Sequence, residues 1–167
     1  MKRILIVGSG GAGKSTIARK IGEILELPVI HLDAHFWNAG WRETPRDEWE
    51  IRVNKLIKGD NWIIDGNFDR TLPARLERAD TVILLDIPHM LCIWRVIKRC
   101  ITHRGKTRPD MAPHCPEKAD MEFLKWIWNY PVHSRPKVLN SIAKAEHVRC
   151  IILQSPNQIN GFLKSLD

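Results

Sequence analysis

A glycine-rich stretch near the start of the chain has the residue types and spacing that could bind phosphate. Its sequence, GSGGAGKS at positions 8–15, follows the pattern G-x-x-x-x-G-K-S. Glycines let the backbone curl so that successive N–H groups point at phosphate oxygens. In such a loop Lys14 places a positive charge on the β- and γ-phosphates, and the hydroxyl of Ser15 is placed to hold Mg²⁺.

The context of this stretch strengthens the interpretation. A short apolar run precedes the glycines and a helical pattern follows them, which is the order in which a phosphate-binding loop joins a strand to a helix. The sequence therefore predicts a cradle for the triphosphate of ATP. The residues expected to bind it are Gly8, Ser9, Gly10, Gly11, Ala12, Gly13, Lys14, Ser15 and Thr16.

Several classes of triphosphate-binding protein are excluded by what the chain lacks. A guanine-specific switch needs an N/T-K-x-D element after a later strand, and the sequence contains none. A motor protein needs far more chain than 167 residues. A small-molecule kinase needs an acid for magnesium, arginines that neutralise the migrating phosphoryl group, and a second substrate site. The sequence offers candidates for all three.

Two acids follow apolar runs and compete for the magnesium role. Asp65 ends the run WIID at positions 62–65, and ligands of parallel sheets bind at the edge where strands end. We therefore expect Asp65 and Ser15 to hold Mg²⁺. The rival, Asp86, precedes Ile87-Pro88 and is interpreted as a helix cap.

Four arginines form a series that leads into a proline-rich loop. Arg95 and Arg99 lie four residues apart and so project from one face of a helix. Arg104 and Arg108 follow in residues 104–118, where one glycine and three prolines rule out a regular element. We predict that this loop is a lid, and that the four arginines act with Lys14 as catalytic residues on the phosphates.

Residues 34–60 are expected to bind the acceptor. Asp33 ends a strand and could accept the proton of an acceptor hydroxyl, whereas a nucleoside monophosphate would need arginines instead. Trp37 and Trp41 could stack on a base or sugar, or could simply pack the loop. The residues predicted to bind the acceptor are Asp33, His35, Trp37, Arg42, Arg46 and Arg70, and Arg75 is a further arginine available for a phosphate.

The elements that must position these residues alternate between strand and helix, which predicts an α/β fold with a parallel sheet between helices. Expected strands cover residues 3–7, 29–32, 62–65, 81–86 and 148–153. A loop is expected from Asp33 to Glu43, and a helix that begins with Thr44 as its N-cap follows it. Further helices are expected from Asp120 to Tyr130 and from Asn157 to Leu166, and Pro131 and Pro136 are expected to kink or divide the chain between them.

Length and composition agree with one globular domain over residues 1–167. The apolar fraction of 44% supports a hydrophobic core, no apolar run is long enough to span a membrane, and we expect a cytoplasmic location. The net charge of +7 favours an anionic partner, and seven of the basic residues cluster between positions 87 and 118, which favours a compact phosphate site.

The four cysteines form no CxxC pair and are expected to be free thiols. Cys100 and His103, followed by His114 and Cys115, have the ligand types for zinc. Adjacent histidine and cysteine make poor chelating geometry, so ordinary side chains are the favoured interpretation.

The motifs resemble the adenylate kinase group of nucleoside and nucleotide kinases. The resemblance rests on positions 8–15, on the run WIIDGN at 62–67 and on the segment from Leu85 to Arg99. More narrowly, the segments HLDAHFW at 31–37, TRPDMAP at 107–113 and WIWNY at 126–130 resemble the bacterial family labelled DNA topology modulation protein.

This resemblance implies a three-layer P-loop fold of the nucleoside and nucleotide kinase type, with a lid and a five-stranded parallel sheet in the order 2-3-1-4-5. It implies that Asp65 supports Mg²⁺, that Arg95 and Arg99 touch ATP, and that the adenine lies near residues 154–157. Adenylate kinases have Pro-Arg after the Asp-Gly motif, where this chain has Asn67-Phe68-Asp69-Arg70. That departure makes AMP a doubtful acceptor.

Two functional hypotheses remain open from the sequence. The first is an ATP-dependent phosphotransferase whose partners are a nucleotide and a small-molecule acceptor. The second is an ATP-binding, DNA-associated regulator, suggested by the net charge and the family label. No helix-turn-helix or zinc finger is visible, which disfavours direct contact with nucleic acid. The acceptor and the oligomeric state are not determined by the sequence.

Overall fold

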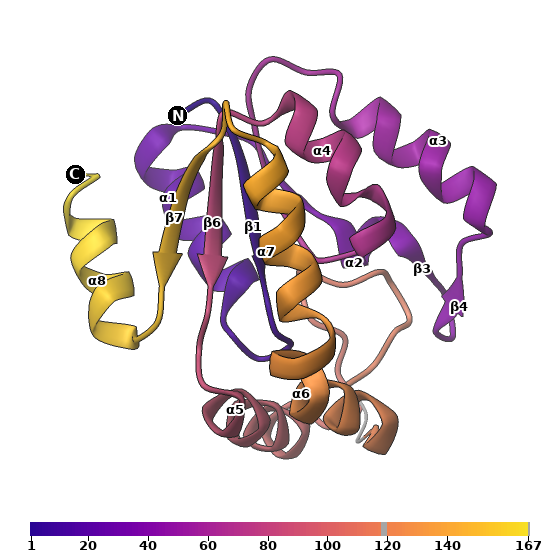
Figure 1. Cartoon of the computed structure of the whole chain (residues 1–167). Coiled ribbons are helices and arrows are strands. Elements are labelled where there is room, and N and C mark those ends of the chain that lie inside the picture. The colour runs from indigo at the N-terminus through magenta and orange to yellow at the C-terminus, as the bar shows by residue number, and fades with distance from the viewer. Residues whose placement is uncertain (118–119, 167) are drawn as a thin grey trace.

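A sheet of five parallel strands forms the centre of the computed structural model, which describes residues 1–117 and 120–166 (Figure 1). Across the sheet the strands are ordered β2-β5-β1-β6-β7, which is 2-3-1-4-5 when only these strands are counted along the chain. The prediction of an α/β fold with this sheet is confirmed. The strands are β1 (Arg3–Gly8), β2 (Val29–His31), β5 (Trp62–Asp65), β6 (Thr81–Leu85) and β7 (Arg149–Leu153).

Helices cover both faces of the sheet, which is why its central strands are apolar at consecutive positions. In β1 the residues Ile4, Leu5, Ile6 and Val7 have no exposed surface. Ile4 and Ile6 belong to the core cluster formed with α1 (Lys14–Leu25), α5 (His89–Thr102) and α8 (Pro156–Lys164). Leu5 and Val7 belong to the cluster formed with α3 (Arg46–Leu56), α4 (Leu72–Arg78) and α7 (Arg135–Lys144). A strand buried on two faces shows no polar alternation.

The helices are short, and most of them cover the two faces of the sheet (Figure 1). The longest described helix, α5, has 14 residues, and no described helix is long and apolar enough to cross a membrane. Their bounds are α1 (Lys14–Leu25), α2 (Leu32–Phe36), α3 (Arg46–Leu56), α4 (Leu72–Arg78), α5 (His89–Thr102), α6 (Met121–His133), α7 (Arg135–Lys144) and α8 (Pro156–Lys164), with the short 3-10 helix η1 (Asp69–Thr71) before α4.

The region from Asp33 to Glu43, predicted as a loop, is more ordered than its sequence pattern indicates. It contains α2 and an antiparallel hairpin of β3 (Trp37–Asn38) and β4 (Arg42–Glu43). The prediction that Thr44 is a helix N-cap is wrong, because its hydroxyl donates to the carbonyl oxygen of Phe36 at 2.5 Å and Pro45 is the N-cap residue. Through this hydrogen bond Thr44 instead joins the end of the hairpin to the end of α2.

One helix runs through a proline that was expected to kink or divide the chain. Helix α6 includes Pro131 in its last turn and ends at His133. Its start is well capped, since the Asp120 carboxylate accepts from the N–H groups of Glu122 and Phe123 at 3.0 and 3.2 Å. Pro136 lies in the first turn of α7, where a missing N–H costs little.

Candidate active site

The glycine-rich loop between β1 and α1 has a backbone that only glycine adopts easily. Gly11 and Gly13 have φ values of 76° and 100°, in the left-handed region. A Cβ atom on Gly11 would lie 2.4 Å from the carbonyl oxygen of Cys92 in α5. The glycines of the motif therefore allow both the curl of the loop and the close approach of α5.

Lys14 curls back over this loop. Its Nζ donates to the carbonyl oxygens of Gly8 and Ser9, both at 2.9 Å. Burial lowers the pKa of Lys14, and the negative charges of Asp33 and Asp65 oppose that shift. No side chain caps the start of α1, so the helix presents its first-turn N–H groups and the positive end of its dipole to an anion.

Asp65 joins this loop to the ends of the neighbouring strands. The hydroxyl of Ser15 donates to Asp65 Oδ2 at 2.6 Å, and Nδ1 of His31 lies 2.6 Å from Asp65 Oδ1. Parallel pairing of β2 with β5 places His31 directly beside Asp65. Because Asp65 is only 3% exposed, both contacts form in a largely desolvated environment.

The ionisable groups around Asp65 have shifted pKa values. For His31, burial lowers the pKa, but the hydrogen bond and charge of Asp65 raise it more, and the net shift is upward. Burial raises the pKa of the Asp33 carboxyl, while the charge of Lys14 opposes that rise. Asp33 is thus a more basic carboxylate than an exposed aspartate, which suits a group that accepts a proton.

Three of the four predicted arginines contact either the glycine-rich loop or Glu117 in the segment that follows α5. Arg95 Nη1 donates to the carbonyl oxygen of Ala12 at 3.3 Å. Arg99 Nε lies 2.9 Å from Glu117 Oε1, and Arg108 Nε lies 2.9 Å from Glu117 Oε2. One buried carboxylate thus holds two guanidinium groups that would be available to phosphates.

Two acids of the loop that follows α5 were missed by the sequence analysis. Asp110 and Glu117 are 7% and 8% exposed, and Arg108 Nη1 donates to Asp110 at 2.9 Å. Burial raises the pKa of Asp110, but the charge of Arg108, a hydrogen bond from Ser15 and the charge of His31 lower it more, and the net shift is downward. A proline-rich segment gives no periodic signal of burial, so only the alternation of acids and arginines within it could have indicated these roles.

The same loop is closed over the hairpin β3-β4. The Gly40 N–H donates to the His114 carbonyl at 3.1 Å, and the Trp41 indole donates to the Pro116 carbonyl at 3.1 Å. Cys115 Sγ lies 3.3 Å from the carbonyl oxygen of Asn38. The predicted lid and the predicted acceptor region are therefore in direct contact. Lys118, the last residue of the predicted lid, lies outside the described residues.

Other residues predicted for the acceptor lie away from the phosphate loop or serve packing. Arg70 Nε pairs with Glu50 at 2.6 Å, and Arg46 lies 3.9 Å from the same carboxylate. Trp37 makes edge contacts with Phe36 and Trp41 at 5.0 and 5.4 Å between ring centroids. Of the remaining residues, Arg42 bonds the Ala39 carbonyl, the His35 carbonyl accepts from Arg52, and Thr16 and Arg104 are exposed.

Two residues considered from sequence have structural roles. Arg75 has no exposed surface and donates to the carbonyl oxygens of the turn that follows Asp65. It is therefore not available to an acceptor phosphate. The interpretation of Asp86 as a helix cap is wrong, because Arg135 binds its two oxygens at 2.7 and 2.8 Å and α5 has no side-chain cap.

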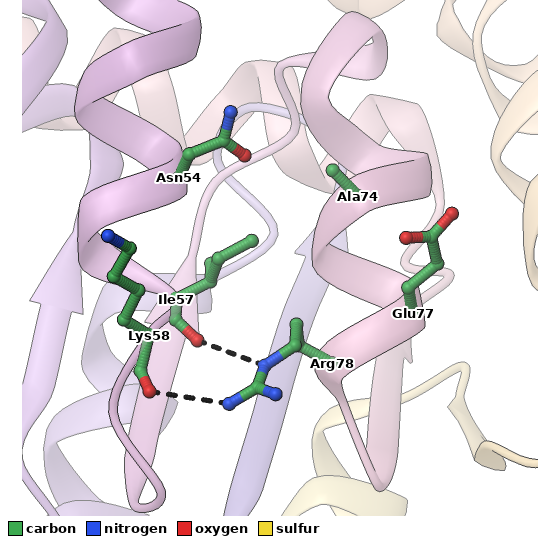
Figure 2. A pocket seen from close by; sticks show the side chains of 6 residues that line it. All are labelled: Asn54, Ile57, Lys58, Ala74, Glu77 and Arg78. Atoms are coloured by element: carbon green, nitrogen blue, oxygen red, sulfur yellow. Dashed lines mark hydrogen bonds between the residues drawn. The ribbon is translucent and has the colours of Figure 1, made fainter.

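A surface hollow of about 550 Å³ lies between α3 and α4 (Figure 2). Its walls include Ile57 and Arg78, which precede the amino ends of β5 and β6. Figure 2 shows Arg78 donating to the carbonyl oxygens of Ile57 and Lys58 across its floor. Since the phosphate loop follows the carboxyl end of β1, this hollow lies at the opposite edge of the sheet from the candidate site.

Two oxygen groups beside the phosphate loop fit Mg²⁺ that is bound together with a nucleotide. Within residues 1–117 and 120–166, no group of three or more histidine, cysteine, aspartate or glutamate side chains could hold a metal ion. Cys100 Sγ lies 3.8 Å from Glu117 Oε1, and Cys115 Sγ lies 3.3 Å from the carbonyl oxygen of Asn38. The Ser15 hydroxyl and the Asp65 carboxylate offer the one or two oxygen ligands that Mg²⁺ uses when phosphates supply the rest.

The sheet order and the glycine loop define a P-loop protein with the architecture of a small-molecule kinase. Among solved structures, a shikimate kinase from Acinetobacter baumannii is similar with a TM-score of 0.62 and 18% identity, covering 99% of this chain and 90% of that one. A gluconokinase from Sinorhizobium meliloti is similar with a TM-score of 0.57 and 14% identity, covering 99% and 89%. At these identities the likeness concerns the fold.

Relatives found by sequence place the chain in a narrower family than its fold does. A protein of Pyrococcus furiosus described as "Putative adenylate kinase" is 35% identical over 168 residues, which cover 96% of this chain and 86% of the relative. A protein of Thermococcus onnurineus with the same description is 27% identical over 143 residues, covering 81% and 72%. No family model matches the chain. The chain belongs to the family of adenylate-kinase-like P-loop proteins that the Pyrococcus relative represents.

Proposed function

We propose that this protein is an ATP-dependent phosphotransferase that moves the γ-phosphoryl group of ATP to a small hydroxylated acceptor. The observation that carries the proposal is the convergence of Lys14, Ser15, Asp65 and Asp33 at the carboxyl edge of the sheet. A cation, an oxygen pair for Mg²⁺ and a half-buried carboxylate are parts that phosphoryl transfer can use. The kinase descriptions of relatives and of similar structures support the same class.

Each group has a physical task in this proposal. Bound Mg²⁺ would neutralise charge on the phosphates, with Ser15 and Asp65 as its protein ligands. Lys14 would leave the carbonyl oxygens of Gly8 and Ser9 and bind phosphate oxygens in their place. The N–H groups at the start of α1 hold the anion, and exclusion of water by the lid suppresses hydrolysis.

The arginines would stabilise the transferring group. Arg95 already lies against the loop, while Arg99 and Arg108 would exchange Glu117 for phosphate oxygens. Three guanidinium groups around the phosphates oppose the charge that develops as the phosphoryl group moves. The proposed catalytic cations are therefore Lys14, Arg95, Arg99 and Arg108. Arg104 is exposed and begins the proposed lid.

Asp33 is the proposed base for the acceptor hydroxyl. It lies within the electrostatic reach of Lys14, and burial makes its carboxylate more basic. The acceptor would bind over residues 34–60, beneath the lid that contacts the hairpin. The Asp33 carboxylate favours an acceptor with a hydroxyl group over a nucleoside monophosphate, which would need arginines instead.

The internal pairing of basic residues supports a transferase over a DNA-associated regulator of the topology modulation type. Arg99, Arg108 and Arg135 bind carboxylates of the protein, and Arg75 is fully buried. Duplex binding depends on arginines and lysines that are free to reach phosphates along a broad face. These four arginines are thus committed to the fold and to the site.

The experiment is a coupled assay of ADP release with Mg²⁺-ATP and a panel of nucleosides, nucleotides and small hydroxylated acids. We expect at least one acceptor to raise turnover above ATP alone, and Lys14→Ala to abolish that turnover while circular dichroism remains unchanged. The matched control is Lys20→Ala, since Lys20 is exposed on the same helix. An unaffected rate in the Lys14 variant would contradict the proposal, as would a panel in which no acceptor has an effect.

A further inference from the structure

Helix α5 is apolar on two opposite faces. Its inner face packs in the core, where Cys92 and Val96 are 0% and 3% exposed. Its outer face carries a stripe of four large apolar side chains, Met90, Trp94, Ile97 and Ile101, which are 44–73% exposed. A surface helix normally presents polar residues on the side away from the core, so the stripe needs another explanation.

The stripe has the spacing of a helix-packing seam. Its four residues are separated by four, three and four positions. Alternating steps of three and four keep side chains in one line along a helix, and this is the pattern by which a helix packs lengthwise against another helix. Lys98 lies beside the stripe with its ammonium 5.1 Å from the centre of the Trp94 ring, and so covers only part of it.

The apolar surface continues onto α6. Met121 and Trp128 are 76% and 56% exposed, and with Ile93 and Leu124 they line a groove of about 500 Å³ between the two helices. Figure 1 shows α5 and α6 lying together at one end of the molecule, with α7 above α6. The stripe and the groove form one surface, called here the α5-α6 face.

The size of the α5-α6 face matches what a stable dimer buries. Its six most exposed apolar side chains are 44–76% exposed. At about 200 Å² for a large side chain, they leave on the order of 700 Å² open. That exceeds the roughly 300–600 Å² of the largest patch on a typical monomer and approaches the ≈800 Å² that each partner of a specific complex contributes.

We propose that a second copy of this chain covers the α5-α6 face, so that the protein is a two-fold symmetric dimer. A two-fold interface must be complementary to itself, with residue i against j and j against i. The rim of the groove meets that condition, because it carries one acid, Glu122, and one base, Lys125. Two copies related by a two-fold axis can pair these charges twice, whereas a membrane-binding face would carry mainly basic residues at its rim.

The dimer would also support the phosphate loop. The inner side of α5 places the Cys92 carbonyl against Gly11 and the Arg95 guanidinium against the Ala12 carbonyl. A partner packed on the outer side would therefore fix the helix that forms one wall of the loop. This inference does not depend on the proposed function, since it rests on the surface alone.

The test is the molar mass of the full chain in solution, measured by sedimentation equilibrium from about 1 to about 100 μM. We expect twice the chain mass for the wild type. Ile101→Glu places a charge at a position that is 73% exposed, so it leaves the fold intact and weakens association about 100-fold or more. Met121→Glu, at the 76% exposed position on α6, should have the same effect.

The matched control is Ile51→Glu on α3, where an isoleucine is 57% exposed outside the face. It should remain dimeric. A monomeric wild type at the highest concentration would overturn the proposal, and so would a dimer that persists in both glutamate variants. Flotation of the wild type as a monomer with anionic vesicles would likewise overturn it and assign the face to lipid.

Discussion

The buried Arg75 provides the most quantitative prediction. Its guanidinium donates to four carbonyl oxygens, three of them in the turn from Gly66 to Phe68 that follows Asp65 and the fourth that of Thr71. Burial lowers the pKa of Arg75 to about 9 against the attraction of Asp69, so the group is still charged at pH 7. Arg75→Met would keep much of the volume but remove every donor.

The magnitude follows from these contacts. At about 1 kcal/mol per net hydrogen bond, the four bonds contribute about 4 kcal/mol. The methionine side chain avoids the cost of burying a charge, and this offsets about 1 kcal/mol of the loss. We therefore expect the free energy of unfolding to fall by about 3 kcal/mol, equivalent to about 9 °C in Tm for a chain of this size.

The assay is urea unfolding followed by tryptophan fluorescence, with Tm from calorimetry. With a slope of about 1.5 kcal/mol per molar urea, the midpoint should shift by about 2 M. Arg78→Met on the same helix is the control, because Arg78 makes only two long bonds of 3.4 and 3.3 Å at the surface. A loss below about 1 kcal/mol in Arg75→Met, or an equal loss in both variants, would refute the reasoning.

Three further predictions concern the site. Asp33→Asn should lower kcat with a responsive acceptor by about 10²–10⁴-fold and change ATP affinity little, and an unchanged kcat would exclude it as the base. The raised pKa of His31 means that its contact with Asp65 stabilises the fold fully below the ordinary value of 6.5. That contribution is lost as pH rises through the folded pKa, so metal-free wild type should lose stability over this range relative to His31→Asn, and parallel pH curves would contradict this. Glu117→Gln should tighten Mg²⁺-ATP binding about 3–10-fold by calorimetry, because two arginines no longer have a competing carboxylate, and weaker binding would show that Glu117 acts otherwise.

The fold was predictable from sequence because its determinants are local. Strand β1 is apolar at four consecutive positions between a charged start and a glycine loop, and this pattern has few structural solutions. The hairpin and α2 were missed because they depend on contacts distant in sequence. Phe36 packs against Trp49 and Phe68, with ring centroids 5.1 and 4.8 Å away, and neither contact leaves a periodic signal near residue 36.

The candidate site was predictable in part for the same reason. A phosphate-binding loop can be recognised from eight consecutive residues. The partner of Arg99 and Arg108 can be identified only from the folded structure. The buried acid Glu117 lies 18 residues from Arg99 in sequence, within a segment that forms no helix or strand and only an isolated bridge between Arg104 and Glu117. The exposed stripe on α5 was hidden in a helix whose inner face is equally apolar, so composition could not separate core from surface there.

The contact between the loop 104–117 and the hairpin β3-β4 has a consequence for the order of events in a catalytic cycle. Gly40, Trp41 and the Asn38 carbonyl all contact that loop. If residues 34–60 bind the acceptor as we propose, these contacts would have to open before it enters, and the same movement of the loop would carry Arg108 away from the nucleotide. Binding of the acceptor and release of the spent nucleotide would then require the same movement of the loop. The acceptor region and the nucleotide site could therefore not open independently.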